Sequence, residues 1–103
     1  MERKLIVDAL REVLDPELGI DIVTLGLIYN IKFDLEGNVD VDMTLTFAGC
    51  PLAQLLINDA KTKIESVEGV KNAKINLVFE PQWNQSMVNE DNYKELLKEN
   101  GSE

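Results

Sequence analysis

The strongest constraint on the fold is the order in which two hydrophobic patterns follow one another along the chain. Apolar residues recur at helical spacing in some segments and alternate with polar residues in others. A repeat near 3.6 residues indicates a helix and a repeat of two indicates a strand, so the order α-β-β-α-β-α is predicted. The predicted helices span residues 3–14, 51–67 and a short segment from about Asn89, and the predicted strands span residues 27–34, 39–47 and 70–79.

The connections between these segments predict how the strands pair. Glu36-Gly37-Asn38 separates the first two strands, so we expect an antiparallel hairpin. A helix separates the second strand from the third, and a right-handed crossover of that kind makes the two strands parallel. The hairpin strands have one apolar and one mostly polar face, so helices should cover one face only. The sequence therefore predicts a single α+β domain over residues 1–103, a two-layer sandwich whose small three-stranded sheet is mixed.

Composition excludes several classes of function. The chain has 19 Asp and Glu residues against 10 Lys and Arg residues, a formal net charge of −9. A phosphate backbone would be repelled by such a domain, so we expect no nucleic-acid partner. The sequence contains no His, which excludes Ser–His–Asp and Cys–His pairs and histidine-based zinc sites. Its one Cys permits neither an intrachain disulfide nor a paired-cysteine motif.

The hydropathy pattern argues against a membrane partner. No apolar run approaches the roughly 18 residues of a membrane span. Residues 1–4, Met-Glu-Arg-Lys, lead into an amphipathic stretch and not into the apolar core of a signal peptide. We therefore expect a cytoplasmic location.

Cys50 is the one residue with both nucleophile and soft-ligand chemistry. It follows a predicted strand and directly precedes Pro51, a favoured first residue of a helix. The unpaired N–H groups and the dipole at a helix N-terminus favour a thiolate. Thr44 and Thr46 lie on the strand that leads to it. The alternative interpretation is a small buried apolar residue at a strand–helix junction, because free Cys is often buried.

Two other segments carry residues of interest. Asp15-Pro16-Glu17 reads most simply as a helix stop followed by a polar turn, although Asp15 and Glu17 could also supply oxygen ligands or acid–base groups beside the thiol. Trp83, the only Trp, is expected to cover an edge of the core with its N–H bonded to a partner. The alternative for Trp83 is an anchor for a partner protein.

Together these segments resemble the small metal–sulfur cluster assembly factors, a family that includes SufT and PaaD. The resemblance runs from about residue 3 to residue 100, and its specificity lies in the combination of segments. The matching segments are residues 15–23, Asp-Pro-Glu-Leu-Gly-Ile-Asp-Ile-Val; residues 25–29, Leu-Gly-Leu-Ile-Tyr; residues 43–46, Met-Thr-Leu-Thr; residues 49–52, Gly-Cys-Pro-Leu; and Pro81 and Trp83.

The resemblance implies a non-catalytic role in iron–sulfur protein maturation. Such a protein carries a labile cluster or adapts an assembly scaffold to its client apoproteins. By the same resemblance, Cys50 is the functional thiol and the metal ligand. Its neighbours in a cluster-binding site would be Asp15, Glu17, Thr44 and Thr46.

A single thiol limits how an iron–sulfur cluster could be held. Ordinary clusters take four Cys ligands, so a monomer of this chain cannot complete a site. A homodimer would pool two thiolates, and the remaining ligands would come from a small thiol, carboxylates or a partner protein. Two alternatives remain: an interaction module in which Cys50 is structural, and a thiol-dependent enzyme without a His base.

Overall fold

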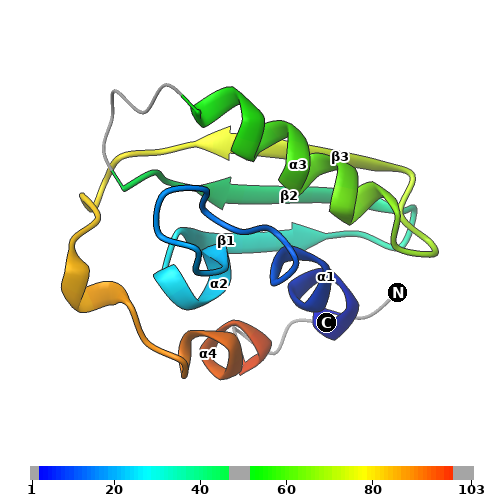
Figure 1. The fold of residues 1–103 in the computed structure, drawn as a ribbon. Coiled ribbons are helices and arrows are strands. Elements are labelled where there is room, and N and C mark those ends of the chain that lie inside the picture. The colour runs from blue at the N-terminus through cyan, green and yellow to red at the C-terminus, as the bar shows by residue number, and fades with distance from the viewer. Residues whose placement is uncertain (1–2, 47–51, 99–103) are drawn as a thin grey trace.

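The computed structural model describes residues 3–46 and 52–98. Its helices and strands follow the predicted order, with two short additions, α2 and η1 (Figure 1). The elements are α1 (Arg3–Leu10), α2 (Ile22–Leu25), β1 (Ile28–Phe33), β2 (Asn38–Met43), α3 (Ala53–Glu65), β3 (Asn72–Leu77), the 3₁₀ helix η1 (Gln85–Met87) and α4 (Asn92–Lys98).

The three strands form one mixed sheet in the order β1-β2-β3. β1 pairs antiparallel with β2, and β2 pairs parallel with β3, with Val41 opposite Ile31 on one side and Ile75 on the other. The crossover from β2 to β3 passes through α3, which lies along β3 (Figure 1). The predicted mixed sheet is confirmed.

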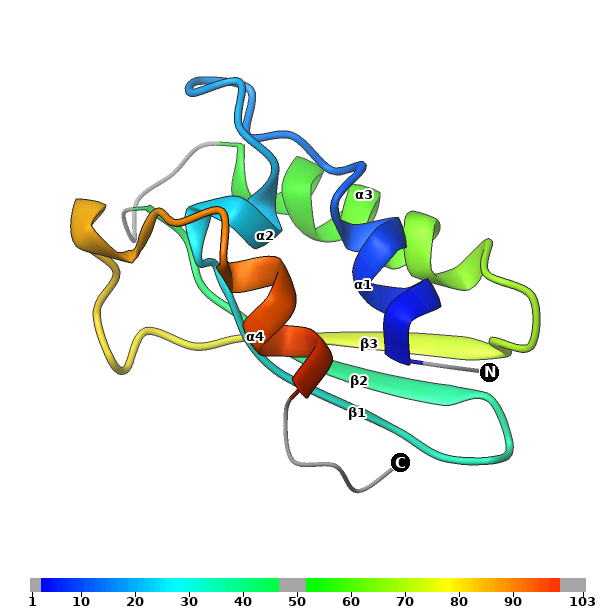
Figure 2. The same ribbon diagram turned by 90° about the horizontal axis from the view of Figure 1, so that it is seen from below.

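Helices α1, α2 and α3 lie on one face of the sheet (Figure 2), and α4 packs against α1 and α2. The apolar faces of both layers meet in one core, which confirms the predicted two-layer α+β sandwich. Burial of each large aliphatic side chain contributes about 1.5–3 kcal/mol. The largest fully buried side chains are Ile6, Val7, Leu10, Val13, Ile22, Val23, Leu25, Leu27, Ile31, Val39, Met43 and Ile64.

The simple alternation predicted for the first strand is wrong at its start. Alternation over residues 27–34 puts Leu27 and Ile31 on the apolar face and Ile28 on the mostly polar one, yet Ile28 and Ile31 are both buried. A bulge between Ile28 and Asn30 shifts the register with β2 and brings both side chains to the core. The first helix also ends earlier than predicted, at Leu10.

The segment predicted as irregular between residues 15 and 26 contains the one-turn helix α2. Asp21 caps its N-terminus, because its carboxylate accepts hydrogen bonds from the Thr24 N–H at 2.9 Å and the Thr24 hydroxyl at 2.7 Å. Gly26 ends it in a left-handed conformation with φ of 84°. These cap signals are in the sequence, but four residues are too few to show a helical repeat.

After β3, residues 78–98 run back toward α2, and we call this segment the C-terminal strap. The Trp83 indole N–H donates to the Leu25 carbonyl at 2.7 Å, and the Asn89 N–H and the Asn92 amide both donate to the Thr24 carbonyl. The expectation that Trp83 covers the core edge with a bonded N–H is thus confirmed. The last helix starts at Asn92, three residues after the predicted position, and the Asn89 side chain accepts from the Asp91 N–H in the turn before it.

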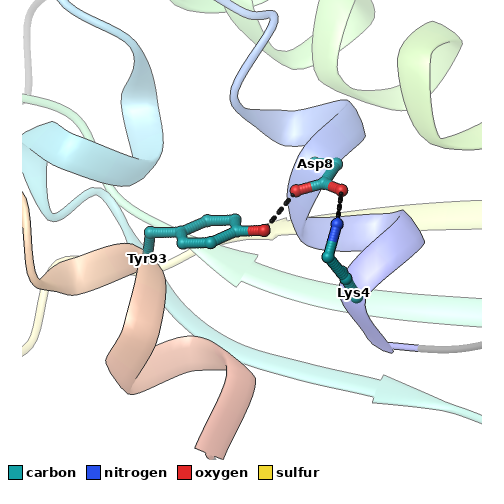
Figure 3. A network of polar contacts seen from close by, with 3 residues as sticks. All are labelled: Lys4, Asp8 and Tyr93. Carbon is teal, nitrogen blue, oxygen red and sulfur yellow. Dashed lines mark hydrogen bonds and ion pairs between the residues drawn. The ribbon is translucent and has the colours of Figure 1, made fainter.

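The strap ends by docking α4 on α1 through Asp8 (Figure 3). The Tyr93 hydroxyl donates to the Asp8 carboxylate at 2.6 Å, and the Lys4 ammonium group donates to it at 2.8 Å. The bonds from Lys4 and Tyr93 lower the pKa of Asp8, and Asp8 raises the pKa of Lys4. The Arg11 guanidinium lies 4.6 Å from the centre of the Tyr93 ring. Within residues 3–46 and 52–98, no helix is long and apolar enough to cross a membrane.

Candidate functional site

A pocket of about 300 Å³ lies where the chain leaves β2 and β3. Because these strands are parallel, both end at the same edge of the sheet, and their continuations form the two walls. In open α/β sheets this carboxyl edge is where ligands bind. Thr44, Leu45 and Thr46 form the wall that follows β2, and Phe79, Glu80, Gln82 and Trp83 form the wall that follows β3.

Thr44 is the buried end of the first wall. It is 1% exposed, and its N–H donates to the Leu27 carbonyl at 2.8 Å, which ties the chain after β2 to the start of β1. Its side chain also hydrogen-bonds to the Tyr29 hydroxyl, which donates to the Pro81 carbonyl at 2.7 Å. Burial raises the pKa of Tyr29, and the bond with Thr44 partly opposes this shift. Tyr29 thus connects the first wall to the strap.

Thr46 lines the first wall of the pocket and Trp83 lines the second. Thr46 is half-buried, and its position two residues after Thr44 places both threonines in the pocket lining. Trp83 is held by its bond to Leu25, so its ring is a fixed part of the second wall. Glu80 and Gln82 are exposed residues of the same wall. Sequence reasoning missed these two, since nothing in their spacing connects them to Thr44 or Thr46.

Asp15 and Glu17 lie outside the described lining of this pocket. Asp15 is 3% exposed, and its carboxylate accepts from the backbone N–H groups of Glu17 at 2.8 Å and Leu18 at 3.1 Å. These bonds fix the turn that carries Glu17, whose side chain is exposed. The role predicted for both residues beside the thiol stays a prediction.

Cys50 lies outside the described residues, as do Gly49 and Pro51. The description resumes at Leu52, the N-cap of α3, which makes no side-chain capping bond. The first turn of α3 contains no acidic residue. Its N-terminal N–H groups therefore receive no compensating carboxylate from that turn.

The described ranges alone do not provide a complete metal site. Among residues 3–46 and 52–98, no group of three or more His, Cys, Asp and Glu side chains could hold a metal ion. Thr44 and Thr46 offer hydroxyl oxygens, and Glu80 offers a carboxylate, but an iron–sulfur cluster takes thiolate ligands. The described residues therefore supply no thiolate ligand.

Comparison with known proteins identifies the family. Residues 3–77 match the model of a family described as iron–sulfur cluster assembly protein. The chain belongs to this family. The resemblance inferred from the sequence motifs is thus confirmed, and the matched region includes α1, α2, α3 and all three strands.

Individual relatives are similar over most of their length. The chain is 50% identical over 91 residues to an Fe–S protein maturation auxiliary factor of Porphyromonas gingivalis, covering 88% of this chain and 87% of that one. It is 45% identical over 76 residues to the Fe–S protein maturation auxiliary factor SufT of Staphylococcus aureus, covering 74% and 86%. A solved structure of a conserved hypothetical protein from Thermotoga maritima superposes with a TM-score of 0.79 at 38% identity, covering 92% and 93%.

Proposed function

We propose that this chain is a maturation factor for iron–sulfur proteins that acts through the Cys50 thiol. It would carry a labile cluster or adapt an assembly scaffold to client apoproteins, the cluster being cargo and not a resident cofactor. The observation that carries the proposal is the family match over residues 3–77, supported by two relatives named as Fe–S protein maturation auxiliary factors.

Chain connectivity supports a thiol close to the described pocket. Cys50 is two positions before Leu52 and four positions after Thr46, so its Cα can be at most about 7 Å from that of Leu52 and about 14 Å from that of Thr46. We therefore propose that the thiol acts beside the N-terminus of α3 and the first wall of the pocket. A helix N-terminus without an acidic first turn favours the thiolate, the form that binds metal.

One thiol per chain supports transfer in preference to storage. A cluster with four thiolate sites keeps open positions on a single copy of this chain. These positions would be filled by a second copy, a small thiol, the assembly scaffold or the client, and exchange among them is how cargo moves. We propose no catalytic role, because the chain has no His base and the Asp15 carboxylate is occupied by two backbone N–H groups.

Anaerobic reconstitution with iron and sulfide tests this proposal, read by visible absorption and by size-exclusion mass. Wild type should gain cluster absorption on a dimer or larger species, and Cys50→Ser should not. A matched control is the double variant Cys50→Ser with Ser66→Cys, which keeps one thiol per chain but moves it to the exposed C-terminal end of α3, about 20 Å along the helix.

Each outcome has a defined meaning. Cluster absorption that appears in wild type and in neither variant supports carriage by a thiol at position 50. Equal absorption in the double variant shows that any exposed thiol suffices and contradicts the proposed site. If no folded variant gains absorption, carriage is excluded and only the adaptor role remains, to be tested by binding to scaffold and client with Cys50→Ser.

A further inference from the structure

β3 is one of the two outer strands of the sheet, and within residues 3–46 and 52–98 no other strand pairs with its outer edge. The Asn72 N–H donates to the Gly37 carbonyl and the Val78 N–H donates to the Met43 carbonyl, so even-numbered residues point their backbone groups toward β2. In a parallel strand the odd-numbered residues then point theirs outward. The outward residues of β3 are Ala73, Ile75 and Leu77.

The first part of this edge is closed by side chains from α3. The Lys61 ammonium group donates to the Ala73 carbonyl at 2.6 Å, and the Ala73 N–H donates to the Glu65 carboxylate at 3.1 Å. Lys61 and Glu65 also lie 3.4 Å apart, so the two side chains occupy both outward groups of Ala73. The open part of the edge is therefore Ile75 to Leu77.

A groove of about 380 Å³ lies between α3 and residues 72–75 of β3, so it meets the open part of the edge at Ile75. Ile57 on α3 and Ile75 on β3 supply apolar lining. Leu77 is 38% exposed and Phe79 is 40% exposed, which extends the apolar surface past the end of the strand. An extended peptide that runs from the end of this groove past Leu77 would bond to the outward backbone groups of Ile75 and Leu77 and place alternate side chains on the apolar surface.

The other edge of the sheet does not offer the same surface. The Arg3 side chain of α1 is buried and donates to the Ile31 carbonyl at 3.2 Å, and it lies 5.6 Å from the centre of the Phe33 ring. This contact blocks the middle of β1. Strand addition is thus directed to β3.

We propose that β3 accepts an extended segment of a partner protein by strand addition, and that this segment alternates apolar and acidic residues. Charge favours this occupant: residues 54–78 carry four Lys and three acidic residues, net +1, whereas the rest of the chain carries −10. β2, which pairs with the inner edge of β3, itself alternates apolar and acidic residues in Val39-Asp40-Val41-Asp42. Its Asp40 lies opposite the exposed Lys74, and Asn76 donates to both Asp40 and Asp42.

A second copy of the chain is the less favourable occupant. Two copies each carry a net charge of −9, which opposes association as a whole. A separate segment from another protein need place only a few carboxylates beside Lys74. The inference does not depend on Cys50 or on cluster binding, so it can fail while the proposed function holds.

The test uses the full chain and two seven-residue peptides with blocked termini. One peptide alternates Val and Asp, and the other alternates Val and Lys. Binding is followed by amide chemical shifts in an NMR titration. The Asp peptide should shift Ile75 and Leu77 and bind more tightly than the Lys peptide. Leu77→Pro removes one outward N–H at a position where an edge strand tolerates Pro, and should weaken binding about tenfold. Leu77→Val, which keeps the N–H and most of the apolar surface, should weaken binding far less than Leu77→Pro.

A peptide-side control removes dependence on how the Pro variant folds. Methylating the alternate backbone nitrogens of the Asp peptide should abolish the shifts in wild type. No shift at Ile75 or Leu77 at millimolar peptide, equal binding of both peptides, or full binding by the methylated peptide would overturn the inference. A mass that rises with protein concentration in wild type but not in Leu77→Pro would assign the edge to a second copy and overturn it equally.

Discussion

The helix-covered sheet and the C-terminal strap are held in place by different kinds of interaction. In the sheet and its helices, large aliphatic side chains such as Leu10, Ile22 and Ile64 are fully buried. Among residues 78–98 of the strap, only Leu96 is buried, and the attachment relies on directional hydrogen bonds from Trp83, Asn89 and Asn92. Stability is thus concentrated in the first region, whereas the second wall of the pocket depends on a few polar contacts.

The largest effect is expected from a cavity in the core. Ile64→Ala on α3 removes a side chain with 0% exposure and should lower the free energy of unfolding by about 2–5 kcal/mol. Leu55→Ala on the same helix is the matched control, because Leu55 is 59% exposed and its loss should cost within about 0.5 kcal/mol. Urea unfolding measures both, and equal losses would contradict the assigned core face of α3.

A smaller effect is expected where the strap approaches α2. Gly26 has a φ of 84°, and a Cβ there would lie 2.7 Å from the Met87 carbonyl oxygen. Gly26→Ala should therefore displace the strap and cost about 3 kcal/mol, combining backbone strain with lost strap contacts. Gly19→Ala has a similar φ of 70° but open space around it, so it should cost only about 1 kcal/mol. If the two variants lose equal stability, the close approach of the strap is not a constraint.

The attachment of Trp83 can be tested alone. Trp83→Phe keeps an aromatic ring in the second wall but leaves the Leu25 carbonyl without its 2.7 Å donor, so we expect a loss of about 2 kcal/mol. Hydrogen exchange should show greater opening of the strap while β2 stays protected. Uniform loss of protection across the sheet would show that the strap and the core unfold as one unit.

The smallest effect concerns the contact between α4 and α1. The pKa of Asp8 is lowered from 3.8 in the folded state, so its contribution is present above that value and is lost as the pH falls through the folded pKa. Tyr93→Phe should remove about 1 kcal/mol near neutral pH and flatten the pH dependence of stability below about pH 4. A pH profile parallel to that of wild type would assign the dependence to other carboxylates.

The same division between regions explains what the sequence could predict. Repeats such as Ile6, Leu10 and Val13, and the alternation of Val39, Val41 and Met43, predicted the helices, the mixed sheet and its covered face, because burial imposes those spacings. The strap follows no such repeat. Its course depends on single bonds to carbonyl groups of Thr24 and Leu25, about 60 residues away, which no local pattern encodes.

The candidate site shows the same limit. Thr44 and Thr46 were predicted from the strand that leads to Cys50, and the structure places both in one pocket. Glu80 and Gln82 were missed, because they reach that pocket only through the strap. In the connection between α1 and β1, the motif Asp15-Pro16-Glu17 was visible in the sequence. The structure shows that the carboxylate of Asp15 accepts hydrogen bonds from backbone N–H groups of its own turn.

The most direct measurement follows cluster delivery to an apoprotein that requires an iron–sulfur cluster. Scaffold-bound cluster is mixed anaerobically with this client and with wild type, Cys50→Ser, or the double variant that carries its thiol at position 66. Wild type should accelerate the recovery of client activity, whereas both variants, though folded, should not. Equal acceleration by Cys50→Ser would contradict a role for this thiol in delivering the cluster.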